Sequence, residues 1–371
     1  MSETYKNTEQ LEKLLQEFID YNISFVSFRI PESSIINVFV FAENNISVIN
    51  TYRDINKNGF VFYPFEANEN SPGLFIEPSH SFNNETIPTD FDLQFWSTEK
   101  QHSSKADIIP EKKIKEQYFT AIDEILNQIK SGKVEKVVLS RTKFIDNISI
   151  KKAPQLFIES AKIYDKAFVY LLNIADKMTW MGASPEILLE SKADKFKTIA
   201  LAGTSAKENL AEINWTQKEI HEQKLVSDFI IEVLKKHKVE KLKQVGPTTV
   251  KAGKLHHIKS DFTFESSQEN YSKIAFDLHP TPAVCGLPQD IAKQIILKVE
   301  NYNRQYYSGF LGLVDNHSCN FYVNLRCMQF LNNGILLYAG GGITIGSDAK
   351  SEWNETESKT KTLLSVIEKI S

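Results

Sequence analysis

A lysine stands at the head of an apolar, β-branched stretch that begins Lys136-Val137-Val138 and ends at Arg141. An ammonium group in a buried strand is costly unless it is paired or has a chemical task. Two interpretations of this stretch are therefore open. Lys136 is a general base in a buried site, or its side chain reaches from the strand end to water and Arg141 is a solvated residue without a chemical role.

A glutamate follows a proline at a predicted turn. Glu186 ends the segment 182–186, which separates two predicted strands, and an apolar run at 187–189 follows it. A carboxyl group pressed against an apolar strand has its pKa raised by desolvation, and a general acid at neutral pH requires such a shift. The alternative is a strand-end glutamate in water.

Two further carboxylates lie on the apolar side of a predicted helix. The helix spans about 213–236, and continuing its apolar stripe by one turn reaches Glu222, with Glu219 three residues earlier. A carboxylate on the core-facing side of a helix needs a cation or a hydrogen-bond network. A buried ion pair and a divalent metal both meet that need. Mg²⁺ suits sparse carboxylate ligation that water and substrate oxygens complete.

Other residues are suited to binding an anion. Arg326 lies inside the apolar strand predicted at 321–327, where a guanidinium group can hold a carboxylate through two hydrogen bonds. The glycine run 340–342 can present backbone N–H groups to an anion, but its spacing is not that of a dinucleotide-binding motif. His256 and His257 face opposite sides of a strand-like segment, so one of them can point into a site. Without a third ligand they do not make a zinc site.

The elements that must position these residues alternate along the chain. Helical periodicity predicts helices at 7–19, 111–131, 154–164, 213–236, 289–301 and 351–370. Apolar runs between turn residues predict strands at 23–30, 36–42, 46–51, 59–64, 135–141, 167–174, 199–205, 321–327 and 334–338, with another opening at 306–309. Residues 178–190 predict two strands with a turn at 182–186 between them. Residues 65–110 are predicted to be irregular structure or a linker. The run 278–288, rich in proline and glycine, predicts a rigid loop that suits a pocket wall.

Composition limits the class of protein. The chain has 371 residues, 42% of them hydrophobic, with 43 Lys and Arg against 47 Asp and Glu. The resulting net charge of −4 does not suggest a nucleic-acid or membrane surface. We find no apolar signal segment at the start and no apolar run long enough to span a membrane. The three cysteines lack metal-site spacing. We therefore expect a soluble, cytoplasmic protein.

From about residue 111 to its end, the chain resembles the chorismate-utilising enzymes, which include isochorismate, salicylate, anthranilate and aminodeoxychorismate synthases. The motifs that carry the resemblance are 136–141, 182–186, 201–204, 221–222, 279–283, 307–309, Arg326, 339–343 and 352–355 with Lys359. The resemblance implies one compact α+β domain like anthranilate synthase component I, with two packed antiparallel β-sheets flanked by helices. Residues 1–110 would be the weakly patterned N-terminal part, and 111–371 the chorismate-binding catalytic core.

Two positions divide the chemistry within this family. The position of Lys136 is usually glutamine in the amine-transferring enzymes, and that of Ala202 is a nucleophilic lysine in the aminodeoxychorismate enzymes. Lys136 and Ala202 therefore favour addition of water, as in menaquinone-type and siderophore-type isochorismate synthases. Ala283 favours them over salicylate synthase, which is the nearest alternative. Tyr307 and Leu325 are less decisive, and Tyr338 is a small departure. An aminating lyase and a non-catalytic chorismate binder are the remaining alternatives.

The resemblance also implies roles for single residues. Lys136 would activate water for attack at C2 of chorismate, and Glu186 would protonate the leaving 4-hydroxyl group. To act as a base, Lys136 must be partly neutral, and we expect burial and nearby cations to favour that form. Arg326 and backbone N–H groups around Gly340 would bind the enolpyruvyl carboxylate.

The remaining assignments concern the metal and the pocket wall. Glu222 and Glu355 would hold Mg²⁺ at the ring carboxylate, with Glu219 and Glu352 acting through water. The expected substrate-binding residues are Ala202, Gly203, Thr204, His257, Ala283, Tyr307, Leu325, Arg326, Gly340 and Lys359. We expect no glutaminase subunit, and a monomer or weak dimer.

Overall fold

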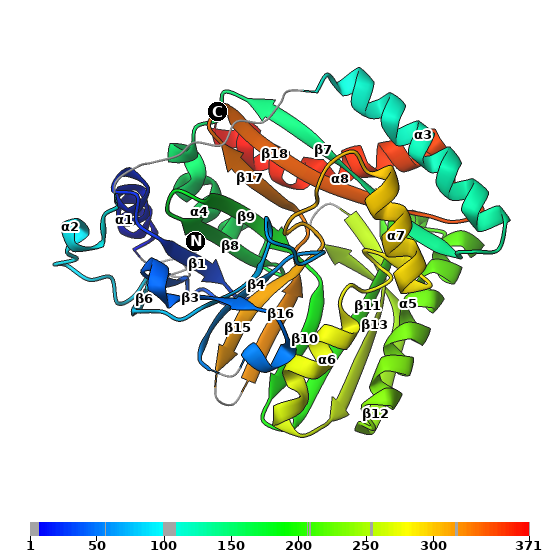
Figure 1. The fold of residues 1–371 in the computed structure, drawn as a ribbon, viewed down its shortest axis with the longest axis horizontal. Coiled ribbons are helices and arrows are strands. Elements are labelled where there is room, and N and C mark those ends of the chain that lie inside the picture. Colours follow the sequence, from blue (N-terminus) through cyan, green and yellow to red (C-terminus); the bar gives the residue numbers. More distant parts are fainter. Residues whose placement is uncertain are drawn as a thin grey trace.

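In this computed structural model, two antiparallel β-sheets form the centre of the molecule (Figure 1). The structure describes residues 7–55, 57–98, 109–205, 207, 209–252, 255–315 and 318–370. Within these ranges each sheet has nine strands. The first, sheet A, has the order β14 (Gly286–Leu287), β7 (Lys136–Asp146), β18 (Gly334–Ile343), β17 (Cys327–Leu331), β9 (Met178–Ser184), β8 (Phe168–Ile174), β1 (Phe25–Arg29), β2 (Asn37–Val40) and β6 (His80–Asn83).

The second, sheet B, begins with the longest strands. Its order is β12 (Glu240–Ala252), β13 (Leu255–Glu265), β11 (Lys195–Ser205), β10 (Ile187–Lys192), β16 (Ser318–Val323), β15 (Phe310–Asp315), β4 (Gly59–Tyr63), β5 (Gly73–Ile76) and β3 (Ile46–Ile49). The chain passes repeatedly between the sheets, so residues far apart in sequence meet where the sheets face each other.

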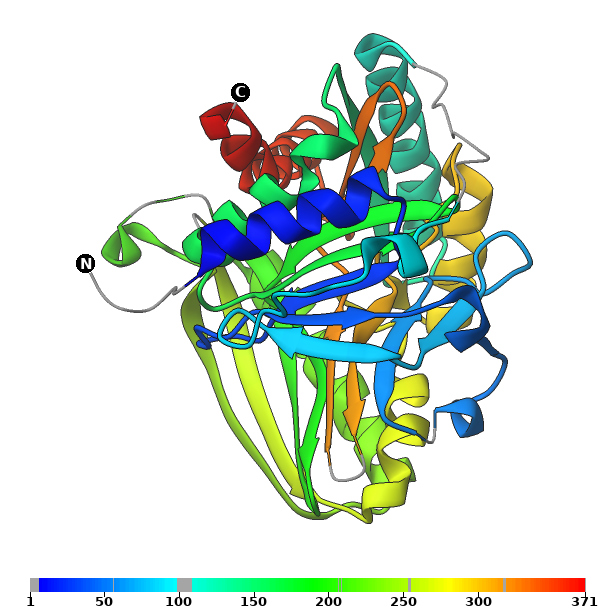
Figure 2. The same cartoon turned by 90° about the vertical axis from the view of Figure 1, so that its left-hand side faces the viewer.

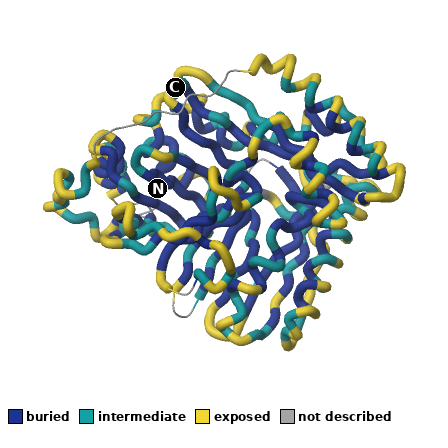
Figure 3. The backbone as a smooth tube through the Cα atoms, viewed as in Figure 1, coloured by how far each residue is buried: buried dark blue, intermediate teal, exposed yellow. Residues whose placement is uncertain are grey.

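An aromatic core joins the two sheets. It includes Phe28, Tyr170 and Trp180 from sheet A and Phe62 and Tyr322 from sheet B, all fully or almost fully buried. Aromatic side chains bury large apolar areas, and area removed from water contributes roughly 25 cal/mol per Å². In Figure 3 the strands are mostly buried, while exposed backbone gathers at loops and on the outer sides of helices.

Helices cover the outer faces of both sheets (Figure 2). Sheet A is covered by α1 (Thr8–Asp20), α4 (Ala153–Ile163) and α8 (Ala349–Ile370), and near β7 by α3 (Glu111–Lys130) and α7 (Gln289–Val299). Sheet B is covered by α5 (Gln217–Lys236) and α6 (Tyr271–Leu278). The short α2 spans Leu93–Trp96. The predicted α+β class, with two antiparallel sheets flanked by helices, is confirmed.

Several local predictions were wrong. Within 65–110, β5, β6 and α2 replace the expected irregular structure, because four-residue elements are too short to show a period; residues 99–108 lie outside the described ranges. The strand predicted at 321–327 is two strands, and Arg326 lies between them with φ 48°. The segment 182–184 belongs to β9, which leaves the turn at 185–186, and the strand expected from 306 begins at Phe310.

Arg141 is not solvated. Its side chain is 3% exposed, forms an ion pair with Glu357, donates from Nε to the Thr356 hydroxyl at 2.7 Å and lies 3.9 Å over the Trp353 ring. Arg141 therefore binds β7 to α8 on the outer face of sheet A. In the described part of the chain, no helix is long and apolar enough to cross a bilayer.

Candidate active site

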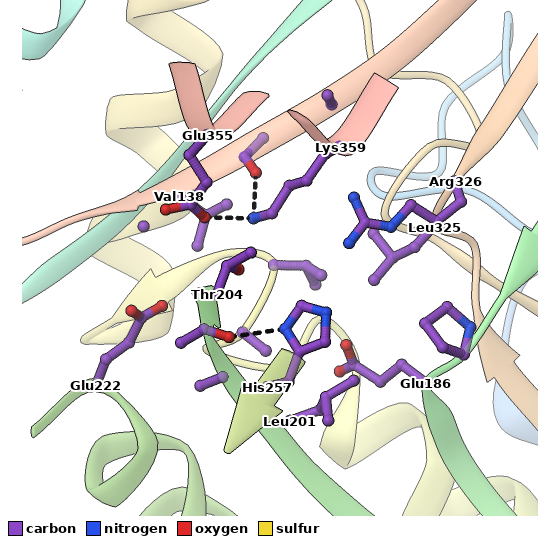
Figure 4. A pocket seen from close by; sticks show the side chains of 18 of the residues that line it. Val138, Glu186, Leu201, Thr204, Glu222, His257, Leu325, Arg326, Glu355 and Lys359 are labelled. Carbon is purple, nitrogen blue, oxygen red and sulfur yellow. Dashed lines mark hydrogen bonds and ion pairs between the residues drawn. The ribbon is translucent and has the colours of Figure 1, made fainter. Parts of the chain in front are cut away.

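One pocket collects nearly all of the predicted site residues, with an empty volume of about 670 Å³ that is partly open to solvent. Its walls come from β7 and β18 of sheet A, β11 and β13 of sheet B, helices α5 and α8, and connecting loops. Of the predicted residues it includes Glu186, Ala202, Gly203, Thr204, Glu222, His257, Ala283, Tyr307, Leu325, Arg326, Gly340, Glu355 and Lys359. Figure 4 shows Glu186, His257 and Arg326 at one part of the pocket and Glu355 with Lys359 at another.

Lys136 lies directly behind the pocket wall. Its side chain is fully buried, and its Nζ is 2.8 Å from Glu222 Oε1. Because side chains alternate along a strand, Lys136 shares a face of β7 with Val138, which lines the pocket. The structure therefore contradicts the alternative in which the lysine reaches to water. It also shows that Glu222, a predicted metal ligand, has this lysine as its counter-ion.

The glycine run in β18 allows these charged groups to approach the backbone. A Cβ atom added at Gly342 would lie 2.5 Å from Glu222 Oε1 and 3.1 Å from Lys136 Cε. At Gly340 it would lie 3.0 Å from the Tyr307 hydroxyl oxygen. At Gly341, on the opposite face, it would lie 3.2 Å from Glu352 Oε2. The run thus serves close packing on both faces of sheet A.

Glu186 has the properties of a general acid. It is 3% exposed, and burial raises its pKa to about 8, although Lys136, Lys359 and Arg326 act in the opposite direction. Its backbone oxygen accepts a hydrogen bond from the Val323 N–H at 2.9 Å, which holds the turn between β9 and β10 against β16. The carboxyl group is therefore protonated at neutral pH and faces the pocket.

Arg326 supplies a cation without a carboxylate partner. Within the described ranges, no carboxylate lies within ion-pair distance of its guanidinium group, and burial lowers its pKa. Its left-handed backbone is rare for a side chain of this size and costs roughly 1–2 kcal/mol. A hydrogen bond from the Ala183 N–H to the Arg326 carbonyl oxygen, at 3.0 Å, holds the turn. A half-buried cation of this kind is prepared for an anionic ligand.

Lys359 and Glu355 form an ion pair on the α8 side of the pocket. Lys359 Nζ is 2.7 Å from Glu355 Oε1 and donates to the Gly340 carbonyl oxygen at 2.8 Å (Figure 4). Burial acts to raise the pKa of Glu355, but Lys359 and the Thr204 hydroxyl outweigh it and hold the pKa below its usual value. Glu355 is therefore ionised.

His257 presents a hydrogen-bond acceptor to the pocket. Its Nδ1 is 2.7 Å from the Gly203 carbonyl oxygen, which can only accept, so Nδ1 carries the proton. Burial, aided by the Arg326 charge, lowers the pKa of His257 to about 3. The ring is therefore neutral, and Nε2 has no hydrogen-bond partner among the described residues. His256 is also buried but does not line the pocket.

Glu219 and Glu352 stand outside the pocket lining. Glu219 caps α5 by accepting a hydrogen bond from the Thr216 N–H at 2.8 Å. Glu352 is 1% exposed and pairs with Lys218, and its Oε2 lacks a hydrogen-bond partner among the described residues. Burial raises the pKa of Glu352. Sequence reasoning missed Lys218, whose charge looked like that of any surface lysine.

The donor set of the pocket fits a sparsely ligated Mg²⁺ ion. Glu222 and Glu355 reach the same pocket from α5 and α8. In the described ranges, no cluster of three or more His, Cys, Asp or Glu side chains is arranged to hold a metal by itself. Two carboxylates need water and ligand oxygens to complete an octahedral shell, as Mg²⁺ sites commonly do.

Some wall residues were not predicted as site residues, although they lie in the motifs 136–141, 182–186, 201–204 and 339–343, in the loop 278–288, or at the departure Tyr338. The pocket is also lined by Val138, Pro185, Leu201, Val284, Tyr338, Ala339 and Gly342. Tyr338 now has a structural reason: its ring stacks on Tyr307 with centroids 5.5 Å apart and on Trp180 at 5.2 Å, and its hydroxyl donates to Gln329 Oε1 at 3.1 Å. Tyr338 therefore holds the Tyr307 ring in place by stacking against it.

Comparison with known proteins assigns the chain to a family. A family model described as chorismate binding enzyme matches residues 79–368. Isochorismate synthase DhbC of Bacillus subtilis (strain 168) is 27% identical over 294 residues, which cover 75% of this chain and 73% of DhbC. Isochorismate synthase EntC of Escherichia coli (strain K12) is 31% identical over 243 residues, which cover 63% of this chain and less than two thirds, 62%, of EntC.

Solved structures show the same fold. DhbC from Bacillus anthracis matches with a TM-score of 0.79 at 23% identity, covering 96% of this chain and 99% of that one. Anthranilate synthase component I from Streptococcus pneumoniae TIGR4 matches with a TM-score of 0.66 at 16% identity, covering 92% of each chain. At these identities the likeness concerns the fold, and the predicted architecture is that of these proteins.

Proposed function

The chain belongs to the chorismate-binding enzyme family, and on that premise we propose that it is an isochorismate synthase, an isomerase that converts chorismate reversibly to isochorismate. This proposal rests on one observation: a buried lysine and a protonated carboxylic acid lie at the same pocket. Lys136 is held at the pocket wall by Glu222, and Glu186 faces the same pocket with a pKa of about 8. The names of the relatives support the same reaction.

The reaction uses Lys136 and Glu186 as base and acid. The ion pair with Glu222 describes Lys136 in its ammonium form, so Lys136 must first lose a proton. The neutral amine then accepts a proton from the water molecule that attacks C2 of the ring. Glu186 donates its proton to the 4-hydroxyl group, which leaves as water while the ring double bonds shift. One water enters and one leaves, so chorismate and isochorismate are isomers. General acid–base catalysis of this kind contributes typically about 10²–10⁴-fold for each group.

The substrate's two carboxylates match the cations of the pocket. Arg326, which has no carboxylate partner among the described residues, would bind the enolpyruvyl carboxylate. Lys359 would assist Arg326 in binding this carboxylate from α8. Lys359 also donates a hydrogen bond to the Gly340 carbonyl oxygen, so Gly340 offers an acceptor as well as the expected N–H groups. The Nε2 acceptor of His257 would receive a hydrogen bond from a substrate hydroxyl group.

Glu222 and Glu355 would hold the Mg²⁺ ion, whose charge would neutralise the ring carboxylate and orient it. Glu352, one oxygen of which lacks a hydrogen-bond partner in the described part of the chain, is proposed to contribute through water. Glu219 is also proposed to act through water, in addition to its role in the helix cap.

Replacing Glu222 tests the metal assignment. We expect Glu222→Ala to raise the Mg²⁺ concentration needed for half-maximal activity by at least about tenfold, since about 1.4 kcal/mol of binding free energy corresponds to a factor of ten. Calorimetric titration with Mg²⁺ should show the same weakening without substrate. Lys136→Gln is the control: it removes the cation that competes for Glu222, so Mg²⁺ should bind at least as tightly. Unchanged Mg²⁺ affinity in Glu222→Ala would refute the assignment.

Adding one methyl group at Gly342 should disturb the same ion pair. The new Cβ would overlap Glu222 Oε1, so the Glu222 carboxylate must move from its present position beside Lys136. We expect Gly342→Ala to lower kcat by about 10²-fold, the effect of a misplacement of about 1 Å. Gly346→Ala is the matched control, since its Cβ would meet no atom within 4 Å. Equal kcat values for Gly342→Ala and Gly346→Ala would show that catalysis does not need the Lys136–Glu222 contact.

An assay with chorismate and Mg²⁺, followed by chromatographic product identification, tests the proposed function. We expect isochorismate as the product. Salicylate with pyruvate would instead identify a salicylate synthase, and a product that depends on ammonium would identify an aminating lyase. Absence of any conversion would favour a non-catalytic binder. We further propose that the enzyme works in the cytoplasm without a glutaminase subunit.

A further inference from the structure

Among the residues that the structure describes, the strand that carries Lys136 has a neighbour of only two residues on its outer side. Strand β14 pairs with β7 at Lys136 and Val137. The Val138 N–H then donates to the Cys285 carbonyl oxygen at 2.7 Å, and β14 reaches no further along β7. A strand edge leaves backbone donors and acceptors that need other partners.

Beyond β14, an ion pair of two side chains binds this edge. The Val138 carbonyl oxygen accepts a hydrogen bond from Arg304 Nη2 at 2.6 Å, and the Ser140 N–H donates to Glu300 Oε1 at 2.7 Å. Arg304 and Glu300 bind each other through two hydrogen bonds, of 2.8 and 2.6 Å, and the side chain of each is 2% exposed. The pair therefore continues the hydrogen-bond ladder of β7 where the neighbouring strand ends.

The same guanidinium group contacts two other parts of the pocket wall. Arg304 Nη1 donates to the Val284 carbonyl oxygen at 2.9 Å, and the group lies 5.9 Å from the centre of the Tyr307 ring. Val138, Val284 and Tyr307 all line the pocket. One buried cation thus links β7, the loop that leads into β14, and the aromatic wall.

The attraction between the two charges does not by itself account for this arrangement. Burying both charges of an ion pair costs desolvation that the attraction between them often fails to repay. Apolar side chains in the same space would satisfy neither the Val138 carbonyl nor the Ser140 N–H. The contacts instead hold the edge of β7 two and four residues beyond Lys136, at Val138 and Ser140. The Val138 side chain lines the pocket.

We propose that the Glu300–Arg304 pair is a positioning clamp that sets the place of Lys136 relative to Glu186 and the substrate. This inference rests on the proposed function, because it assigns the clamp to the base of that reaction. Neither Glu300 nor Arg304 lines the pocket. Both act through β7 and the loop that they hold.

Arg304→Lys tests the clamp. Lysine keeps the charge but cannot donate to Val138, Val284 and Glu300 from one planar group. We expect kcat to fall about 10²-fold, as for a catalytic group misplaced by about 1 Å, while KM changes little. The pH at which the rate falls on the alkaline side should stay where it is in the wild type, because Glu186 is untouched.

Arg141→Lys is the matched control. Arg141 lies on β7, the strand that the clamp holds. Like Arg304 it is buried and paired with a glutamate, but it is on the face of β7 that packs against α8. We expect it to lower Tm as Arg304→Lys does and to leave kcat unchanged. Equal kcat in the two variants at comparable Tm would overturn the proposal. If Arg304→Lys fails to fold, Glu300→Gln, which keeps the shape of the side chain, is read against Arg141→Lys in the same way.

Hydrogen exchange separates failure of the clamp from failure of the proposed function. Without substrate, Arg304→Lys should speed exchange of the Val138 and Ser140 amides, and Arg141→Lys should not. If the wild type does not convert chorismate, the proposed function fails and these amides still report on the clamp. Unchanged exchange in Arg304→Lys would refute the clamp whatever the wild type catalyses.

Discussion

Lys136→Gln is expected to lower the rate of isochorismate formation by about 10²–10⁴-fold while chorismate still binds. The amide has nearly the length of the lysine side chain but cannot accept a proton from water. The loss should therefore appear in kcat, because Arg326 and Lys359, which would bind the substrate's carboxylates, remain in place. Steady-state kinetics together with calorimetric chorismate binding separate the two effects.

Lys143→Gln is the control for this experiment. Lys143 lies on the same strand and is also ion-paired, with Glu357 at 2.8 Å, but it does not line the pocket. It should retain full activity. A Lys136→Gln enzyme that made isochorismate at the wild-type rate would rule out Lys136 as the base.

Glu186→Gln is expected to remove a comparable factor, about 10²–10⁴-fold, because glutamine cannot protonate the leaving hydroxyl group. The wild-type acid works in its protonated form, so kcat/KM should fall as the pH rises through about 8, the pKa of Glu186. The variant should lack this alkaline fall in its residual activity. Glu190→Gln, four residues along in β10 and outside the pocket lining, should behave as the wild type.

The same carboxyl group should make the wild type less stable at high pH. In the folded protein Glu186 keeps its proton up to about pH 8. In the unfolded chain the same carboxyl group has the ordinary pKa of 4.5 and releases the proton at lower pH. The stability that comes from the protonated, buried form is complete below pH 4.5 and is lost as the pH rises towards 8. At pH 7 the loss is roughly 3 kcal/mol, taking 1.36 kcal/mol for each pKa unit.

Glu186→Gln should therefore be more stable than the wild type at pH 8 and similar to it at pH 4. Denaturant unfolding at both pH values measures this difference. A variant that is less stable at pH 8 would show that the carboxyl group is not a strained catalytic acid. An increase in stability with a loss of activity is the expected trade at a catalytic site.

The spacing of apolar and polar residues along the chain predicted much of the fold and most of the charged residues of the candidate site. Glu222 was placed by helical periodicity, and Glu186 by its position against an apolar strand. Arg326 was predicted to bind an anion from within a strand. The residue is instead in a turn with a left-handed backbone conformation. Strand pairing decides where a strand ends, and a single sequence does not contain that pairing.

Contacts between distant segments were invisible in the sequence for the same reason. Lys136 and Glu222 looked like separate features, one a base and one a metal ligand, although they form a single ion pair. Glu300 and Arg304 are spaced like an ordinary surface pair, and only the packing of β7 against the loop after α7 buries them. Arg141 looked solvated because the helix that covers it begins more than two hundred residues later.

The central claim is that a water molecule activated by Lys136 replaces the 4-hydroxyl group of chorismate. Incubation of the wild-type protein with chorismate and Mg²⁺ in ¹⁸O-water, followed by chromatography and mass measurement, tests this directly. We predict isochorismate that carries one solvent oxygen at C2, and about 10²–10⁴-fold slower formation of this labelled product when Lys136→Gln replaces the wild type. Unlabelled isochorismate, or a labelled product formed at an equal rate by Lys136→Gln, would contradict the account.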